Sequence, residues 1–130
     1  MISSVRLDGT TACMTIEGAT NTEVFQAYVR ELLVPVLRPG DIVIMDNLGA
    51  HKDEQTLALI RQAQAEIRFL PAYSPDLNPI EMMWSKVKAL LRKAEARNHP
   101  DLIKAIAHSL QSVCAQDALG WFACCGYNFI

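Results

Sequence analysis

Two acidic residues, Asp46 and Glu81, lie at positions where their carboxylates could bind a cation. Asp46 directly follows the apolar run Ile42–Met45, and Glu81 is the third residue of a long amphipathic segment that begins at Pro79. In open α/β sheets, ligand sites form outside the carboxyl ends of the strands, which is where Asp46 is expected. Carboxylate oxygens are preferred ligands of hard cations such as Mg²⁺, and two such ions about 4 Å apart can assist phosphoryl transfer.

Each of these residues alone also has an ordinary structural explanation. Asp46 can be a strand-end residue that turns into a loop. With Asn78 as N-cap and Pro79 at the first helical position, Glu81 falls where an acidic side chain stabilises a helix in any case. The pair is more informative, because the 34 residues between them (81 − 46 − 1) can hold a helix, a strand and a loop that return the second carboxylate to the first.

The helices and strands that must position these residues can be predicted from the periodicity of apolar residues and from the residues that favour turns. Asp8-Gly9, between two β-prone runs at 2–7 and 11–17, predicts a hairpin with a type I′ turn, and a catalytic role for Asp8 is the less favoured alternative. Thr20 with Glu23 predicts a capping box, followed by a helix that ends near Pro35. The continuous apolar run at 42–45 predicts a central strand buried on both faces.

The rest of the chain continues this alternation of helix and strand. We expect a helix at 53–65, a strand at 67–70, a proline-rich loop at 71–79, helices at 79–96 and 101–115, and an apolar tail at 121–130. Strands that alternate with helices indicate an α/β domain with a mixed sheet.

Composition limits the function classes. A chain of 130 residues is long enough for one domain, and its net charge is −2, from 12 basic and 14 acidic residues. A self-sufficient DNA-binding domain is usually strongly basic, so this chain alone should bind DNA weakly unless its positive charge lies on one face. Its four cysteines form no CxxC pair and are expected to be reduced and mostly buried. With no signal peptide and no apolar run of membrane-spanning length, we predict a cytoplasmic protein without a membrane partner.

Two longer motifs make the chemistry specific. The pattern D-N-x-x-x-H occupies 46–51, and L-P-x-Y-S-P-x-L-N-P-I-E-x-x-W occupies 70–84. Together they closely resemble the DDE transposases of bacterial insertion sequences related to the Tc1/mariner superfamily. The resemblance covers nearly the whole chain, including the Asp8-Gly9 hairpin and the terminal Cys125-Gly126-Tyr127.

The resemblance implies a ribonuclease-H-like fold, which is a mixed sheet with flanking helices, and a catalytic triad of Asp, Asp and Glu. Asp46 matches the second Asp and Glu81 the Glu, so both are expected to be catalytic and to bind Mg²⁺ or Mn²⁺; the 34-residue gap is typical of this branch. The implied activity is DNA cleavage at transposon ends, followed by attack of a DNA 3′-OH on target DNA.

The chain departs from the family pattern at its start. The family's first Asp lies on a strand upstream of the hairpin, and neither that strand nor the helix-turn-helix region is found here. We therefore expect residues 1–130 to be a single domain, the C-terminal part of a catalytic domain. It should be inactive unless an upstream transposase polypeptide supplies the first Asp. The alternative is a non-catalytic remnant or oligomerising module that pairs an exposed sheet edge with itself or with a full-length transposase.

Polar residues of the two motifs are candidates for supporting roles. Asn47 is expected to orient Asp46 or to make an Asx turn, and His51 to contact phosphate, position water or stabilise its loop. Asn78 is the expected N-cap before Glu81, at the end of a loop that three prolines make rigid.

Other side chains are candidates for DNA contact. Tyr73 could stack on DNA, although packing is the favoured interpretation. Lys86, Arg92 and Lys93 on the long helix are candidates for DNA-backbone contacts, against the alternative of a solvated helical face.

Overall fold

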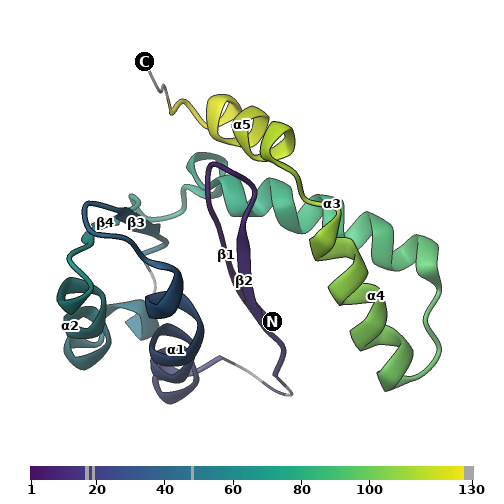
Figure 1. The fold of residues 1–130 in the computed structure, drawn as a ribbon, viewed down its shortest axis with the longest axis horizontal. Coiled ribbons are helices and arrows are strands. Elements are labelled where there is room, and N and C mark those ends of the chain that lie inside the picture. Colours follow the sequence, from purple (N-terminus) through teal and green to yellow (C-terminus); the bar gives the residue numbers. More distant parts are fainter. Residues whose placement is uncertain (17, 19, 48, 128–130) are drawn as a thin grey trace. The chain divides into compact units, whose positions relative to one another are not determined.

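The computed structural model describes residues 1–16, 18, 20–47 and 49–127. These residues divide into two compact units, which are considered in turn. The first unit comprises Met1–Ser4 and Ala12–Asn78, and the second comprises Val5–Thr11 and Pro79–Ile130. Figure 1 labels the helices and strands of both units.

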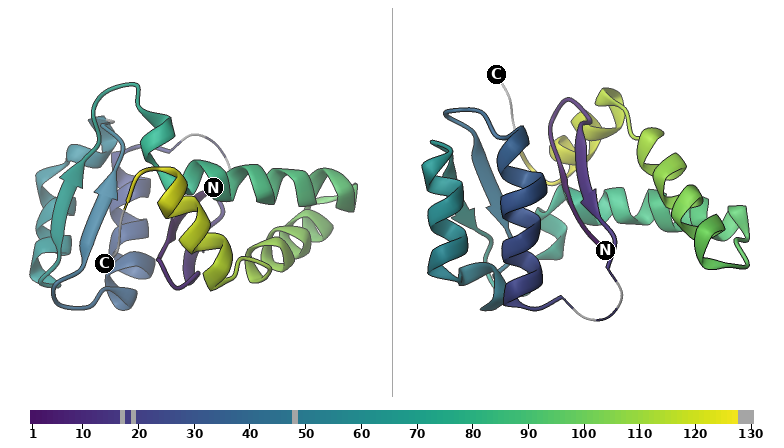
Figure 2. Two further views of the ribbon diagram at one scale, coloured as in Figure 1. Left: turned by 90° about the horizontal axis from the view of Figure 1, so that it is seen from above. Right: turned by 60° about the horizontal axis from the view of Figure 1, so that its bottom comes forward.

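The first unit is built on two parallel strands, β3 (Ile42–Met45) and β4 (Glu66–Phe69). They are joined by α2 (Glu54–Gln62), as parallel neighbours require a crossover connection. The views of Figure 2 show α1 (Thr22–Tyr28) and α2 on the same side of the strand pair. Because the strands run in the same direction, their carboxyl ends meet at one edge, where Asp46 follows β3.

The core of the first unit lies between the strand pair and these helices. Its buried members are Phe25, Tyr28, Val29, Leu33, Met45, Leu57, Ile60 and Ala65. After Tyr28 the helical path continues as a π-helical segment, Val29–Leu33, and a 3₁₀ turn, Val34–Val36, so the expected end near Pro35 is confirmed. The Tyr28 hydroxyl donates a 2.7 Å hydrogen bond to the Ala12 carbonyl, and burial raises the pKa of Tyr28 to about 12.

Two sequence predictions about this unit are wrong in detail. The helix cap is Asn21 and not Thr20, because the Asn21 side chain accepts the Val24 N–H at 2.9 Å and α1 begins one residue later. The strand at 42–45 is not buried on both faces, since Ile42 is 57% exposed. Both helices lie on one side of the two-stranded sheet, and the outer side keeps its apolar residues partly in solvent.

The hairpin at the start of the chain is confirmed, with a different turn. Strands β1 (Ile2–Val5) and β2 (Thr11–Met14) form a two-stranded sheet. Gly9 N–H donates to the Arg6 carbonyl and Arg6 N–H to Thr10, each at 2.9 Å. Only Gly9 of the Asp8-Gly9 pair has a positive φ, +88°, whereas a type I′ turn needs two. The connection is a three-residue loop with a glycine bulge.

The second unit consists of three helices and the tip of that hairpin. Helices α3 (Pro79–Ala94), α4 (His99–Gln111) and α5 (Ala115–Cys124) enclose a core centred on Met83, Val87 and Val113. The hairpin tip packs against the start of α5, where a β-carbon on Gly9 would lie 2.6 Å from the Cys114 carbonyl carbon.

Helix α5 is the element that the sequence analysis did not predict. Its N-cap is Cys114, whose thiol accepts the Asp117 N–H while the Asp117 carboxylate accepts the Cys114 N–H, a capping box made with sulfur. The expected apolar tail at 121–130 is helical through Cys124, and residues 128–130 lie outside the described part.

The four cysteines are free, as expected, but they are not mostly buried. Cys125 is buried and Cys13 half-buried, where burial raises the pKa of the Cys13 thiol, whereas Cys114 and Cys124 are exposed. Among the described residues, none of the helices combines the length and apolar character needed to cross a bilayer.

The α/β class is confirmed. In the described part of the chain, the strands form two separate two-stranded sheets, β1-β2 and β3-β4, so one continuous mixed sheet of ribonuclease-H type stays a prediction.

Candidate functional site

Asp46 is held at the carboxyl edge of β3 by a residue from the second motif. It follows Met45, a core residue with 7% exposure, and is itself half-buried. Its Oδ1 accepts a 3.0 Å hydrogen bond from Asn78 Nδ2, across 32 residues of chain. This bond fixes the direction of the carboxylate, and among the described residues no hydrogen-bond donor contacts Oδ2.

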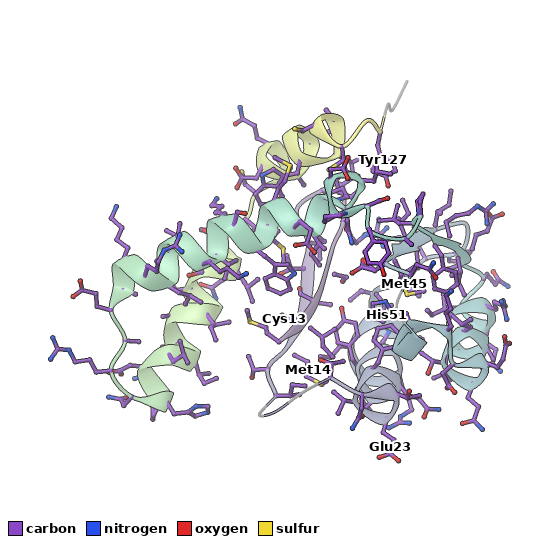
Figure 3. The ribbon with its side chains drawn as sticks, turned by 180° about the vertical axis from the view of Figure 1, so that it is seen from behind. Cys13, Met14, Glu23, Met45, His51 and Tyr127 are labelled. Atoms are coloured by element: carbon purple, nitrogen blue, oxygen red, sulfur yellow. The ribbon has the colours of Figure 1, made fainter. Side chains whose placement is uncertain are left out.

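His51 supports the backbone of Asp46. Its Nδ1 lies 3.3 Å from the Asp46 carbonyl oxygen, and its ring packs on Phe25, with ring centroids 4.4 Å apart. Because a carbonyl only accepts, Nδ1 carries the proton in this contact. Figure 3 labels His51 and Met45 among the side chains of the first unit. This geometry supports the loop-stabilising explanation of His51.

Asn47 has no comparable role in the described part of the chain. It is exposed, and no hydrogen bond joins its side chain to Asp46. The amide that orients Asp46 comes from Asn78, which sequence analysis treated as a helix cap. The sequence marks Asn78 only as the residue that ends the loop before Pro79, and it carries no local signal for a contact with Asp46 across 32 residues.

The loop between β4 and Asn78 begins and ends at the carboxyl edge of β3. Leu70 N–H donates to the Met45 carbonyl at 2.8 Å, and a 3₁₀ turn at Pro75–Leu77 leads into Asn78. Tyr73, within this loop, is fully exposed and has a φ of +56°. The expectation that Tyr73 packs is therefore wrong.

Glu81 lies in the first turn of α3, as predicted, and is exposed. Its backbone carbonyl accepts a 3.2 Å hydrogen bond from Ser85 Oγ. Asp46 belongs to the first unit and Glu81 to the second, so the convergence of the two carboxylates stays a prediction.

The oxygen ligands near Asp46 are of the type that a hard cation binds, but they are too few for a complete metal site. Carboxylate and amide oxygens, as at Asp46 and Asn78, are the ligand type that Mg²⁺ and Mn²⁺ take. Over the described ranges, no group of three or more His, Cys, Asp or Glu side chains is placed to hold a metal ion.

The three candidate DNA contacts on α3 differ in availability. Lys86 Nζ lies 2.5 Å from Asp117 Oδ2 and 3.0 Å from the Ser112 carbonyl, with about a third of its side chain exposed. The hydrogen bond from Lys86 lowers the pKa of Asp117. Arg92 and Lys93 are exposed in the last turn of α3, where cations are favoured by the helix dipole.

Comparison with known proteins gives one family. A family model described as DDE superfamily endonuclease matches residues 1–103, a range that includes Asp46, Asn78 and Glu81. No curated protein matches the chain significantly.

Proposed function

Because this chain belongs to the DDE superfamily endonucleases, we propose that it is part of a transposase domain that performs Mg²⁺-dependent phosphoryl transfer on transposon-end DNA. The observation that carries the proposal is the Asn78–Asp46 hydrogen bond. It joins the first acidic motif to the segment that leads directly into the second.

The covalent chain limits how far Glu81 can be from this contact. Glu81 follows Asn78 by three residues, and three residues span at most about 11 Å when fully extended. This limit holds for any arrangement of the two units. It supports the proposal that Asp46 and Glu81 serve one cation site, as the two family carboxylates do.

In the proposed site, each residue has a separate task. Asp46 and Glu81 would hold Mg²⁺ or Mn²⁺, Asn78 would keep Asp46 Oδ1 directed, and His51 would fix the Asp46 backbone. A bound cation pair would activate the attacking oxygen and stabilise the leaving one. A third carboxylate is needed, and the resemblance assigns it to a strand that precedes the hairpin, in the same or a separate polypeptide.

DNA contacts are proposed mainly for Arg92 and Lys93. Both residues are exposed, whereas Lys86 forms an ion pair with Asp117. Such contacts read the backbone and not the sequence, so they would position DNA without selecting it. We also propose that the βαβ arrangement of β3, α2 and β4 belongs to a ribonuclease-H-like sheet.

The test is nicking of a transposon-end duplex with Mg²⁺, by the chain alone and with the upstream transposase polypeptide. We expect cleavage only with both polypeptides, and its loss with Asp46→Asn or Glu81→Gln. Lys104→Gln, a substitution of an exposed residue on α4, is the control and should cleave normally. Cleavage that survives both acidic substitutions would rule out the proposed roles.

A second candidate is a non-catalytic interaction module. The observation that favours it is the outer side of the β3–β4 pair, where Ile42 is 57% exposed. A two-stranded sheet can also extend by pairing the edge of a strand with another chain. Concentration-dependent dimerisation that Ile42→Lys abolishes, together with no cation binding, would favour this function over the enzyme.

A further inference from the structure

Tyr73 combines two features that do not stabilise the folded chain. Its side chain is fully exposed, so its ring has no packing partner among the described residues. Its φ of +56° lies in the left-handed region, which disfavours a bulky residue and is easily adopted only by Gly or Asn. Backbone strain of this kind persists where surrounding structure imposes it, and it concentrates at sites of function.

The surrounding structure does fix this loop. Before Tyr73, the Leu70 N–H is bonded to the Met45 carbonyl, and after it Asn78 is bonded to the Asp46 carboxylate. A 3₁₀ turn occupies Pro75–Leu77, and the Ser74 hydroxyl donates to the Ala72 carbonyl at 3.2 Å. Tyr73 is therefore carried on a short loop whose two ends are both held at the carboxyl edge of β3.

A cation lies at the same edge. Lys52, which is exposed, places Nζ 5.7 Å from the centroid of the Phe69 ring at the end of β4. Phe69 is itself 36% exposed. Exposed aromatic rings and a cation at one sheet edge are the groups with which proteins bind a single nucleic-acid strand, through base stacking and phosphate contact.

We infer that Tyr73 is a stacking platform for one unpaired nucleobase of the DNA strand at the Asp46 edge. This inference rests on the proposed function for the identity of the strand as DNA. Bases inside a duplex are already stacked on each other, so a free ring can accept only a base at a frayed end, an overhang or an extruded position. A chain of net charge −2 is poorly suited to bind an intact duplex through its phosphates.

The experiment measures binding of the whole chain to a single-stranded oligonucleotide carrying 2-aminopurine, in EDTA so that no cleavage occurs. The same sequence as a blunt duplex is the comparison. We expect tighter binding to the single strand, with quenching of 2-aminopurine fluorescence as the base stacks. The affinity should depend weakly on salt, with a slope of about 0.7 for a single phosphate contact from Lys52.

Two substitutions at the same position separate the ring from the backbone. Tyr73→Gly removes the ring and accepts the left-handed conformation without strain, and it should weaken single-strand binding about 5- to 150-fold. Tyr73→Phe keeps an aromatic ring, so it should bind the single strand and quench 2-aminopurine fluorescence as the wild type does. Leu119→Ala removes a different exposed apolar side chain, 51% exposed in the second unit, and should change neither.

The outcomes also separate this inference from the proposed function. Asp46→Asn should bind the strand at least as tightly as the wild type, because stacking needs no cation. If no nicking is found but single-strand binding still depends on Tyr73, the proposed function is wrong and the inference about Tyr73 stands. Three results would overturn the inference. Tyr73→Gly and the wild type could bind the single strand equally, or the wild type could fail to bind it. Alternatively, Tyr73→Gly could lose self-association and keep its DNA binding.

Discussion

The two units treat their acidic residues differently. In the first unit, Asp46 receives a side-chain hydrogen bond from Asn78 and backbone support from His51. In the second unit, Glu81 is exposed, and an ion pair joins Lys86 to Asp117, between α3 and α5. The first unit thus fixes a candidate ligand, whereas in the second unit an ion pair connects two helices.

This difference has a physical consequence. A carboxylate that is directed before a cation arrives loses little conformational freedom on binding, whereas an exposed Glu must be ordered at that moment. We expect Asp46 to define the position of the cation and Glu81 to complete its coordination.

The two cores should each carry several kilocalories of stability. Ile60 in the first unit and Met83 in the second are both fully buried. Substitution of either by Ala should lower the free energy of unfolding by about 2–5 kcal/mol, because a cavity remains. Hydrogen exchange should show a larger loss of amide protection in the unit that carries the substitution than in the other unit. An equal loss in both units would contradict the division.

Asn78→Ala should weaken cation binding about 10- to 100-fold, as is typical when a group that orients a metal ligand is removed. Manganese titration of the isotope-labelled chain measures this. Asn47→Ala, in the same region but without contact to Asp46, is the control and should bind as the wild type does. An unchanged affinity in Asn78→Ala would show that the hydrogen bond does not preorganise Asp46.

Gly9→Ala should destabilise the second unit by more than about 1 kcal/mol, because alanine is strained at positive φ. The added β-carbon would also meet the Cys114 backbone at 2.6 Å. Thermal unfolding measures the effect. Gly40→Ala, with a φ of +89° and open space around it, is the matched control and should show only the backbone part.

The Lys86–Asp117 pair should add about 1 kcal/mol at most, since both side chains are partly in water. The pKa of Asp117 is lowered in the folded chain, so the unfolded chain binds more protons as the pH falls through the acidic range. The contribution is present above the ordinary carboxyl pKa of about 4 and is lost below it. Asp117→Asn should therefore be less stable than the wild type at neutral pH, with the gap closing on acidification in urea unfolding. A gap that is independent of pH would contradict this assignment.

Much of the secondary structure could be predicted because period and turn residues act locally. The helical spacing around Phe25 and Val29, the presence of strands β3 and β4 and the start of α3 at Pro79 are in this class. Helix α5 was missed because its cap is a cysteine and Gly120 interrupts its pattern. A thiol is an uncommon cap, and glycine lowers helix propensity.

The site was predictable by residue type but not by contact. Asp46 and Asn78 were both candidates from their motifs, yet their hydrogen bond depends on how a loop of defined length returns to β3. The exposure of Tyr73 also depends on that loop path, since its sequence context alone favours packing. Long-range contacts of this kind have no local signal.

Mn²⁺ broadening of amide NMR signals in the whole labelled chain can show whether Asp46 and Glu81 share one cation. We predict that signals around both residues broaden at the same Mn²⁺ concentration, and that Asp46→Asn removes the broadening around Glu81 as well. Broadening around Glu81 that persists unchanged in Asp46→Asn would contradict a shared site.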